Sequence, residues 1–145
     1  MNNQHMSLLQ IRNLSLSIGL FDILHDVSLD VAPGEIVAIT GESGSGKSMT
    51  AFATMGLLPD GARTGGEILL EGTDLLALSE PALCQVRGAR VGMVFQEPMT
   101  ALNPVQTIGA QVAETIRQHE NLPKAEAMER ARAMLRGAGC VVAFT

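Results

Sequence analysis

Alternating apolar and polar positions predict two half-buried strands near the N-terminus. Residues 14–18 and 27–31 each carry an apolar side chain at every second position. One face of such a strand packs on a core while the other meets solvent. Residues 19–26 join the two runs, so we expect the strands to pair antiparallel. A further strand is expected over residues 67–71, after a connector through residues 65–66.

Two continuous apolar runs, residues 36–39 and 91–95, have a different pattern. Such runs are typical of strands buried on both faces of a parallel sheet. Pro33 and Gly34 form a turn into the first run. Apolar residues at helical spacing predict a helix over residues 47–58, and Ser79 is placed to cap a short helix with Pro81 in its first turn.

Two more helices are expected towards the C-terminus. Ile108, Val112 and Ile116 share one face of the first. After Pro123, the second helix has Met128, Ala131, either Met134 or Leu135, and Ala138 on its apolar face. Strands that alternate with helices in this order predict an α/β protein.

Composition narrows the class of function. A chain of 145 residues is enough for one domain, and its net charge of −5 without a Lys/Arg cluster argues against a nucleic-acid partner. Cys84 and Cys140 are expected to be free thiols in a reducing compartment. No apolar run reaches the roughly 18–20 residues of a membrane span, and the N-terminus lacks a signal-peptide pattern. We therefore expect a cytosolic chain that meets a membrane only through partners.

Candidate chemistry lies in residues 41–48, which match the pattern G-x-x-x-x-G-K-[ST] between an expected strand and an expected helix. Glycines let the main chain curl so that its N–H groups face an anion, and the helix N-terminus adds further donors. Lys47 can reach the β- and γ-phosphates of a nucleotide, and the Ser48 hydroxyl can bind Mg²⁺. A flexible glycine-serine linker is the alternative, although a chance match is expected in under roughly 1% of chains this long. The candidate nucleotide-binding residues are Gly41, Glu42, Ser43, Gly44, Ser45, Gly46, Lys47, Ser48 and Met49.

The second informative segment is residues 96–104, Gln-Glu-Pro-Met-Thr-Ala-Leu-Asn-Pro, directly after an apolar run. With the loop and the order of elements, it makes the chain resemble ATP-binding subunits of ABC transporters, in particular the oligopeptide/dipeptide import group, over roughly residues 7–139. The resemblance implies the N-terminal half of a P-loop NTPase (RecA-like) core with an antiparallel β subdomain and the start of a helical subdomain. This partial domain would span residues 1–139, followed by a non-matching tail at 140–145.

The resemblance also implies roles for individual residues. Gln96 would contact Mg²⁺ or the attacking water and sense the permease, and Lys47 would share the catalytic work; a neutral amide can both donate and accept hydrogen bonds. In the family an aromatic residue stacks on adenine, where this chain has Ile18. Phe21 is close enough to substitute, or it simply packs at a strand end.

By resemblance, the cofactors are ATP and Mg²⁺. The partners are membrane permease subunits, a second ATP-binding subunit and, indirectly, an extracytoplasmic solute-binding protein. The location is the cytoplasmic face of the inner membrane, with the subunit bound peripherally.

The chain departs from the family by lacking an L-S-G-G-Q segment, an apolar strand that ends in Asp-Glu, and a His after it. We therefore expect a truncation or frameshift, little ATP hydrolysis by the isolated chain, and poor solubility because strand edges stay open. Three functions stay open: half of an ATP-hydrolysing transport motor, a non-catalytic nucleotide-binding remnant or regulatory fragment, and another P-loop enzyme such as a small-molecule kinase. The kinase would need an acceptor pocket and an Asp in the second buried strand.

Overall fold

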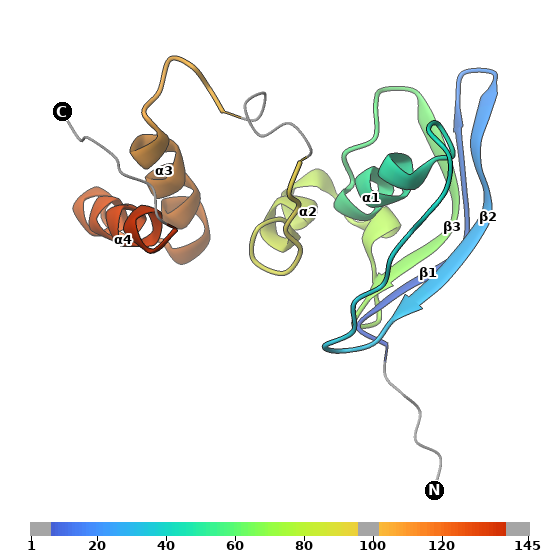
Figure 1. Ribbon diagram of the computed structural model, residues 1–145, viewed down its shortest axis with the longest axis horizontal. Coiled ribbons are helices and arrows are strands. Elements are labelled where there is room, and N and C mark those ends of the chain that lie inside the picture. The colour runs from blue at the N-terminus through green and yellow to red at the C-terminus, as the bar shows by residue number, and fades with distance from the viewer. Residues whose placement is uncertain (1–6, 96–101, 139–145) are drawn as a thin grey trace, which may run out of the picture. The chain divides into compact units, whose positions relative to one another are not determined.

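The computed structural model describes residues 7–95 and 102–138, and it divides into two compact units (Figure 1). Unit 1 runs to Arg87 and unit 2 begins at Gly88. Each unit has its own buried core, so each is described by itself.

Unit 1 is built on a four-stranded antiparallel sheet with the order β2-β1-β3-β4. The expected antiparallel pairing of the first two strands is confirmed, but their connection is only Gly19 and Leu20, much shorter than expected, because both strands continue to the turn. Gly65 and Gly66 lie within the third strand, so the connector expected there is wrong. The strands are β1 (Leu9–Ile18), β2 (Phe21–Val31), β3 (Ala62–Leu70) and β4 (Thr73–Asp74).

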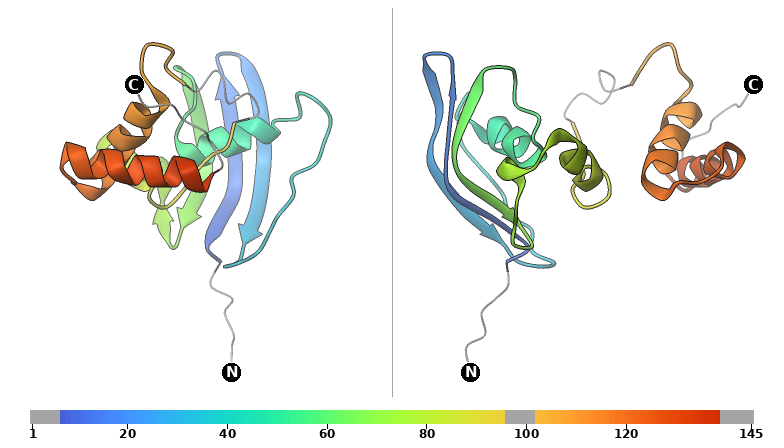
Figure 2. Two further views of the ribbon diagram at one scale, coloured as in Figure 1. Left: turned by 60° about the vertical axis from the view of Figure 1, so that its left-hand side comes forward. Right: turned by 180° about the vertical axis from the view of Figure 1, so that it is seen from behind.

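A line of irregular residues crosses three strands of this sheet. Asn13, Asp26 and Gly66 have φ values of 50°, 50° and 87°. The Asn13 Nδ2 amide donates to Asp26 Oδ1 at 2.5 Å, and register shifts interrupt both pairings of β1 near Asn13. Bulges of this kind bend strands and increase their twist, and Figure 2 shows the resulting curvature of the sheet.

Helix α1 (Lys47–Met55) lies against the concave face of the sheet (Figures 1 and 2). Its start agrees with the sequence prediction, but it ends at Met55, earlier than expected, and Gly56 is its C-cap. Gly56 has φ 61° and donates its N–H to the Ala53 carbonyl at 3.0 Å, which gives the left-handed C-terminal cap that glycine favours. The buried residues of unit 1 are Ile11, Leu14, Leu16, Leu24, Thr50, Ala53, Met55, Ile68, Leu70, Leu75 and Val86.

The last part of unit 1 contains the short helices η1 (Leu75–Ala77) and α2 (Glu80–Val86). Ser79 occupies the N-cap position of α2 as expected, although its side chain makes no capping bond. Arg87 donates from Nε to the Met55 carbonyl at 2.7 Å and from Nη2 to the Gly56 carbonyl at 2.8 Å. These bonds fix the chain after α2 to the C-terminus of α1.

The prediction of two fully buried strands is wrong for this chain. Residues 36–39 and 91–95 belong to no strand, and Ile36 and Val94 are each 96% exposed. A parallel strand needs hydrogen-bonded neighbours that are distant in sequence. None of the strands in the described residues pairs with either run, so their apolar side chains have no sheet to enter.

Unit 2 contains the helical hairpin of α3 (Ile108–Glu120) and α4 (Lys124–Gly137). The Thr107 hydroxyl caps α3 by accepting from the Ala110 N–H at 3.3 Å. The predicted faces are confirmed at Ile116 and Ala131, which are buried, but Ile108 is 43% exposed and Ala138 is also exposed, so the prediction is wrong at these two helix ends. Leu135 is buried while Met134 is 58% exposed, which settles the alternative between them. The shared core consists of Ala113, Ile116, Ala127 and Ala131, with Val112, Leu122 and Met128 packed against it.

Candidate nucleotide-binding site

The glycine loop leads directly into α1, as its sequence pattern predicts. Within the loop the Ser45 N–H donates to the Glu42 carbonyl at 3.2 Å, which forms a turn. Gly46 has φ 89°, and a Cβ built on it would lie 2.4 Å from Leu24 Cδ2 of β2. A side chain at Gly46 would be strained at this φ value and would have to displace the buried Leu24 side chain, where the loop rests on the sheet.

The first turn of α1 offers free donors. Its first helical bond runs from the Thr50 N–H to the Gly46 carbonyl at 2.9 Å, so the N–H groups of Lys47, Ser48 and Met49 precede the helical ladder. No side chain caps this end of the helix, and Ser48 is exposed. An anion placed here would meet main-chain donors together with the positive end of the helix dipole.

Lys47 holds its ammonium group across the loop. Nζ donates to the carbonyls of Gly41 at 2.9 Å and Glu42 at 2.6 Å, and to Ser45 Oγ at 3.3 Å. These bonds hold a full positive charge against the loop that precedes α1. The arrangement suits the dense negative charge of a polyphosphate.

The residues present also fit Mg²⁺. The described part of the chain has no group of three or more His, Cys, Asp or Glu side chains that could hold a metal ion. Mg²⁺ does not require one, because it is commonly held by one or two protein oxygens, substrate phosphates and water. The exposed Ser48 hydroxyl is an oxygen donor at the correct end of α1, and it would hold the ion together with the phosphates.

The other candidate residues lie apart from the loop in sequence. Phe21 begins β2, pairs with Ile18 across the hairpin and is 74% exposed. Gln96 lies outside the described residues. The roles assigned to Phe21, Gln96 and the loop residues stay predictions.

Sequence reasoning missed the residues that support the loop. Leu24 contacts Gly46 from β2, and the Thr50 hydroxyl, which is buried, donates back to the Gly46 carbonyl at 3.2 Å. Thr50 lies four residues after Gly46, which is the spacing at which a threonine hydroxyl in a helix can donate to a main-chain carbonyl. No local pattern predicts the role of Leu24, because its contact with Gly46 joins two residues that lie 22 positions apart in the sequence.

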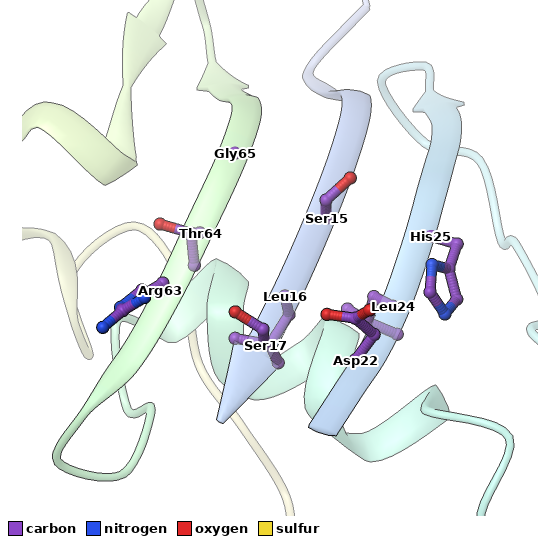
Figure 3. A pocket seen from close by; sticks show the side chains of 9 residues that line it. All are labelled: Ser15, Leu16, Ser17, Asp22, Leu24, His25, Arg63, Thr64 and Gly65. Atoms are coloured by element: carbon purple, nitrogen blue, oxygen red, sulfur yellow. The ribbon is translucent and has the colours of Figure 1, made fainter. Parts of the chain in front are cut away.

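A separate hollow of about 320 Å³ lies on the sheet near the β1–β2 turn (Figure 3). Ser17 is paired with Asp22 on one side and with Arg63 on the other, so the three form one polar row. This hollow has neither a glycine loop nor a helix N-terminus, and the loop before α1 is the stronger candidate. The complete lining is Ser15, Leu16, Ser17, Asp22, Leu24, His25, Arg63, Thr64 and Gly65.

A membrane-spanning helix needs about 20 consecutive, mostly apolar residues. None of the helices in the described residues combines this length with the required apolar character.

Comparison with known proteins places this site in a family. A family model described as "ABC transporter" matches residues 24–141, which include the loop. A probable peptide ABC transporter ATP-binding protein of Sinorhizobium fredii is 49% identical over 115 residues, 78% of this chain and 34% of the relative. A probable D,D-dipeptide transport ATP-binding protein of Escherichia coli is 49% identical over 129 residues, 85% of this chain and 39% of the relative.

Other relatives agree with this assignment. An oligopeptide transport ATP-binding protein of Escherichia coli is 41% identical over 133 residues, 89% of this chain and 40% of the relative. An oligopeptide transport ATP-binding protein of Mycobacterium tuberculosis is 52% identical over 94 residues, 65% of this chain and 15% of the relative. The chain thus spans well under half the length of these relatives. On the family match and its P-loop, the chain belongs to the ABC transporter family and has the α/β class of the P-loop NTPases.

Proposed function

We propose that this chain is the nucleotide-binding part of an ATP-binding subunit that powers peptide import through an ABC transporter. The observation that carries the proposal is the Lys47 ammonium group, held over the loop by the Gly41 and Glu42 carbonyls beside the uncapped start of α1. The names of the relatives, which specify peptide, dipeptide and oligopeptide transport, support the solute class. The family match favours this function over a small-molecule kinase.

Each part of the loop has a defined task in this proposal. Main-chain N–H groups from Gly44 to Ser48 bind the phosphates, and Lys47 neutralises charge on the β- and γ-phosphates. When bound, Mg²⁺ would supply positive charge to offset the negative charge that develops during hydrolysis. Ser48 and Gln96 would hold it, and Gln96 would also orient the attacking water.

The whole transporter would supply the remaining parts. We propose that the subunit binds membrane permease subunits and a second ATP-binding subunit on the cytoplasmic face of the membrane. An extracytoplasmic solute-binding protein would deliver the peptide, and no nucleic acid takes part. Hydrolysis belongs to the complete protein, because this chain lacks the family's Asp-Glu strand and L-S-G-G-Q segment.

The sequence leaves a second candidate function open. A chain that has the phosphate cradle without a general base would bind nucleotide and not turn it over. It could then act as a non-catalytic remnant or a regulatory fragment that docks on permease or intact ATPase subunits.

Calorimetric titration with ATP, with and without Mg²⁺, tests nucleotide binding, which both candidate functions require. We expect saturable binding that is tighter with Mg²⁺, and a loss of at least about tenfold in affinity for Lys47→Ala, since one charge-assisted contact contributes about 1.5–3 kcal/mol. Equal binding by the wild type and Lys47→Ala would refute the site.

Phosphate release by the same purified chain tests whether this chain can turn nucleotide over by itself. We expect no Mg²⁺-dependent hydrolysis above the Lys47→Ala background, which leaves binding without turnover. Hydrolysis that Lys47→Ala abolishes would show that a general base lies within this chain, and would exclude the non-catalytic function.

A further inference from the structure

The hydroxyl of Thr50 is buried in the first turns of α1, behind the end of the helix that faces the loop. Thr50 is 4% exposed, and among the residues that the structure describes it is the one buried residue with a polar side chain. A buried hydroxyl needs a hydrogen-bond partner, because its burial without one carries a desolvation cost. Thr50 Oγ1 meets this need by donating to the Gly46 carbonyl at 3.2 Å.

The Gly46 carbonyl therefore accepts two hydrogen bonds, one from the Thr50 N–H at 2.9 Å and one from the Thr50 hydroxyl. This carbonyl and the Lys47 N–H belong to one planar peptide group, which is trans. In a trans peptide group the C=O and N–H bonds point in opposite directions. A carbonyl that is turned into the helix thus directs the Lys47 N–H out of the first turn, where an anion would bind.

The orientation of this peptide group is restricted from two directions. Leu24 of β2 lies against Gly46 and limits its movement towards the sheet, while the Thr50 hydroxyl opposes rotation of the carbonyl out of the helix. The second hydrogen bond also polarises the peptide group, which makes the Lys47 N–H a stronger donor. The side chain of Thr50 thereby acts on a main-chain donor that it does not contact.

We propose that Thr50 is a positioning residue of the nucleotide site, whose buried hydroxyl orients and polarises the Lys47 N–H through the Gly46 carbonyl. The inference rests on the proposed nucleotide-binding function and adds a residue that would not touch the ligand. The glycine-loop pattern ends at Ser48 and does not include Thr50. Thr54 offers an internal comparison, because its hydroxyl donates in the same way to the Thr50 carbonyl at 3.0 Å. That carbonyl lies one turn further from the loop, and the N–H of its peptide group is already used within the helix.

Calorimetric titration of the full chain with ATP and Mg²⁺ compares three variants with the wild type. Thr50→Val keeps the β-branched shape without the hydroxyl, and it should weaken ATP binding by about fivefold, the effect of one hydrogen bond. Thr50→Ser keeps the hydroxyl and should bind ATP within about twofold of the wild type. Thr54→Val removes the matched hydroxyl and should leave the affinity unchanged.

The amide signal of Lys47 reports the peptide group directly. The sequence contains two lysines, Lys47 and Lys124, so ¹⁵N-lysine labelling gives one amide signal from the start of α1 and one from the start of α4. Loss of a hydrogen bond to the Gly46 carbonyl reduces the polarisation of its peptide group. The Lys47 signal should therefore move upfield in Thr50→Val and stay in place in Thr50→Ser and Thr54→Val, while Lys124 in unit 2 stays unchanged in all three.

The outcomes separate this inference from the function on which it rests. Absence of ATP binding by the wild-type chain would refute the proposed function itself. If the wild type binds ATP, an unchanged affinity of Thr50→Val, an equal loss in Thr50→Ser or Thr54→Val, or a Lys47 signal that Thr50→Val does not move would overturn only this inference. If Thr50→Val does not fold, Thr50→Cys makes the same test, because a thiol of similar size is only a weak donor.

Discussion

The antiparallel sheet and residues 36–39 are both rich in apolar side chains, yet only the sheet buries them. Leu14 and Leu16 of β1 are 0% and 1% exposed, whereas Ile36 is 96% exposed. β1 is hydrogen-bonded to β2 on one side and to β3 on the other. The comparison teaches that an apolar sequence becomes a buried strand only where backbone partners are available.

Distance along the sequence explains which apolar segment pairs with a neighbouring strand. A two-residue turn joins β1 to β2, so their pairing needs little loop-closure entropy. A parallel strand must pair through a crossover of a dozen or more residues. An exposed apolar run of this kind favours association between copies, and the poor solubility expected from the sequence stays a prediction.

The largest expected difference in the free energy of unfolding is that between Leu16→Ala and Ile36→Ala. Leu16 is 1% exposed, and its truncation should lower the free energy of unfolding by about 3 kcal/mol, the middle of the range for buried leucines. Ile36→Ala should change it by less than about 0.5 kcal/mol, as for exposed sites. Urea titration followed by far-UV circular dichroism measures both, since the chain has no Trp or Tyr. A loss above about 1.5 kcal/mol for Ile36→Ala would show that residues 36–39 are buried after all.

The same contrast explains how far the sequence predicts this fold. Residues 14–18 and 27–31 were predicted as antiparallel strands because alternation and short connections are local properties, and the start of α1 at Lys47 followed from the glycine pattern. The continuous apolar runs at residues 36–39 and 91–95 are an equally local pattern, and they predict strands that the structure does not contain. Their structure depends on partners that no local pattern supplies.

The candidate site is predictable to a similar extent. The loop motif gave the residues from Gly41 to Met49, since their chemistry depends on contiguous main chain. It gave neither Leu24, which supports Gly46, nor Arg87, which holds the end of α1. Both contacts join segments distant in sequence, and only the fold brings them together.

Gly66→Ala tests the bulge that bends the antiparallel sheet. Gly66 has φ 87°, and a Cβ there would lie 2.4 Å from the carbonyl oxygens of both Arg12 and Asn13. Strain of the backbone and the clash together should cost about 2–3 kcal/mol. Gly65→Ala is the matched control, because its Cβ would meet only Ser15 Cβ at 3.9 Å. Equal urea midpoints for the two variants would contradict the bulge geometry.

Arg87→Met tests whether side-chain hydrogen bonds, without strand pairing, hold the end of α2 to the end of α1. The guanidinium group donates to the carbonyls of Met55 and Gly56, 32 and 31 residues away, and its side chain is 20% exposed. Removing these donors should cost about 2 kcal/mol, since hydrogen bonds from charged groups contribute about 1.5–3 kcal/mol. Methionine keeps much of the apolar stem, so urea unfolding that matches the wild type would show that the bonds do not stabilise unit 1.

Glu80→Gln gives the smallest expected effect and a pH signature for the same junction. The hydrogen bond from Arg87 lowers the pKa of the Glu80 carboxyl below its ordinary value of 4.5, and the hydrogen bond with Glu80 raises the pKa of Arg87. A carboxyl whose folded-state pKa is lowered stabilises the fold above its unfolded-state pKa. This stabilisation is lost as the pH falls through the folded-state value. Glu80 is exposed, so solvent screens its charge and the change in Tm should be small.

The pH dependence decides whether the carboxylate itself is responsible. The Tm difference between wild type and Glu80→Gln should be greatest near pH 7 and should vanish below the folded-state pKa, where Glu80 is protonated in both folded and unfolded chains. Glu114→Gln replaces an exposed acidic residue of α3 for which the described residues show no ion pair, and it controls for the change in net charge. A difference that persists unchanged at low pH would assign the effect to side-chain shape, and Arg87 would then hold α1 without help from Glu80.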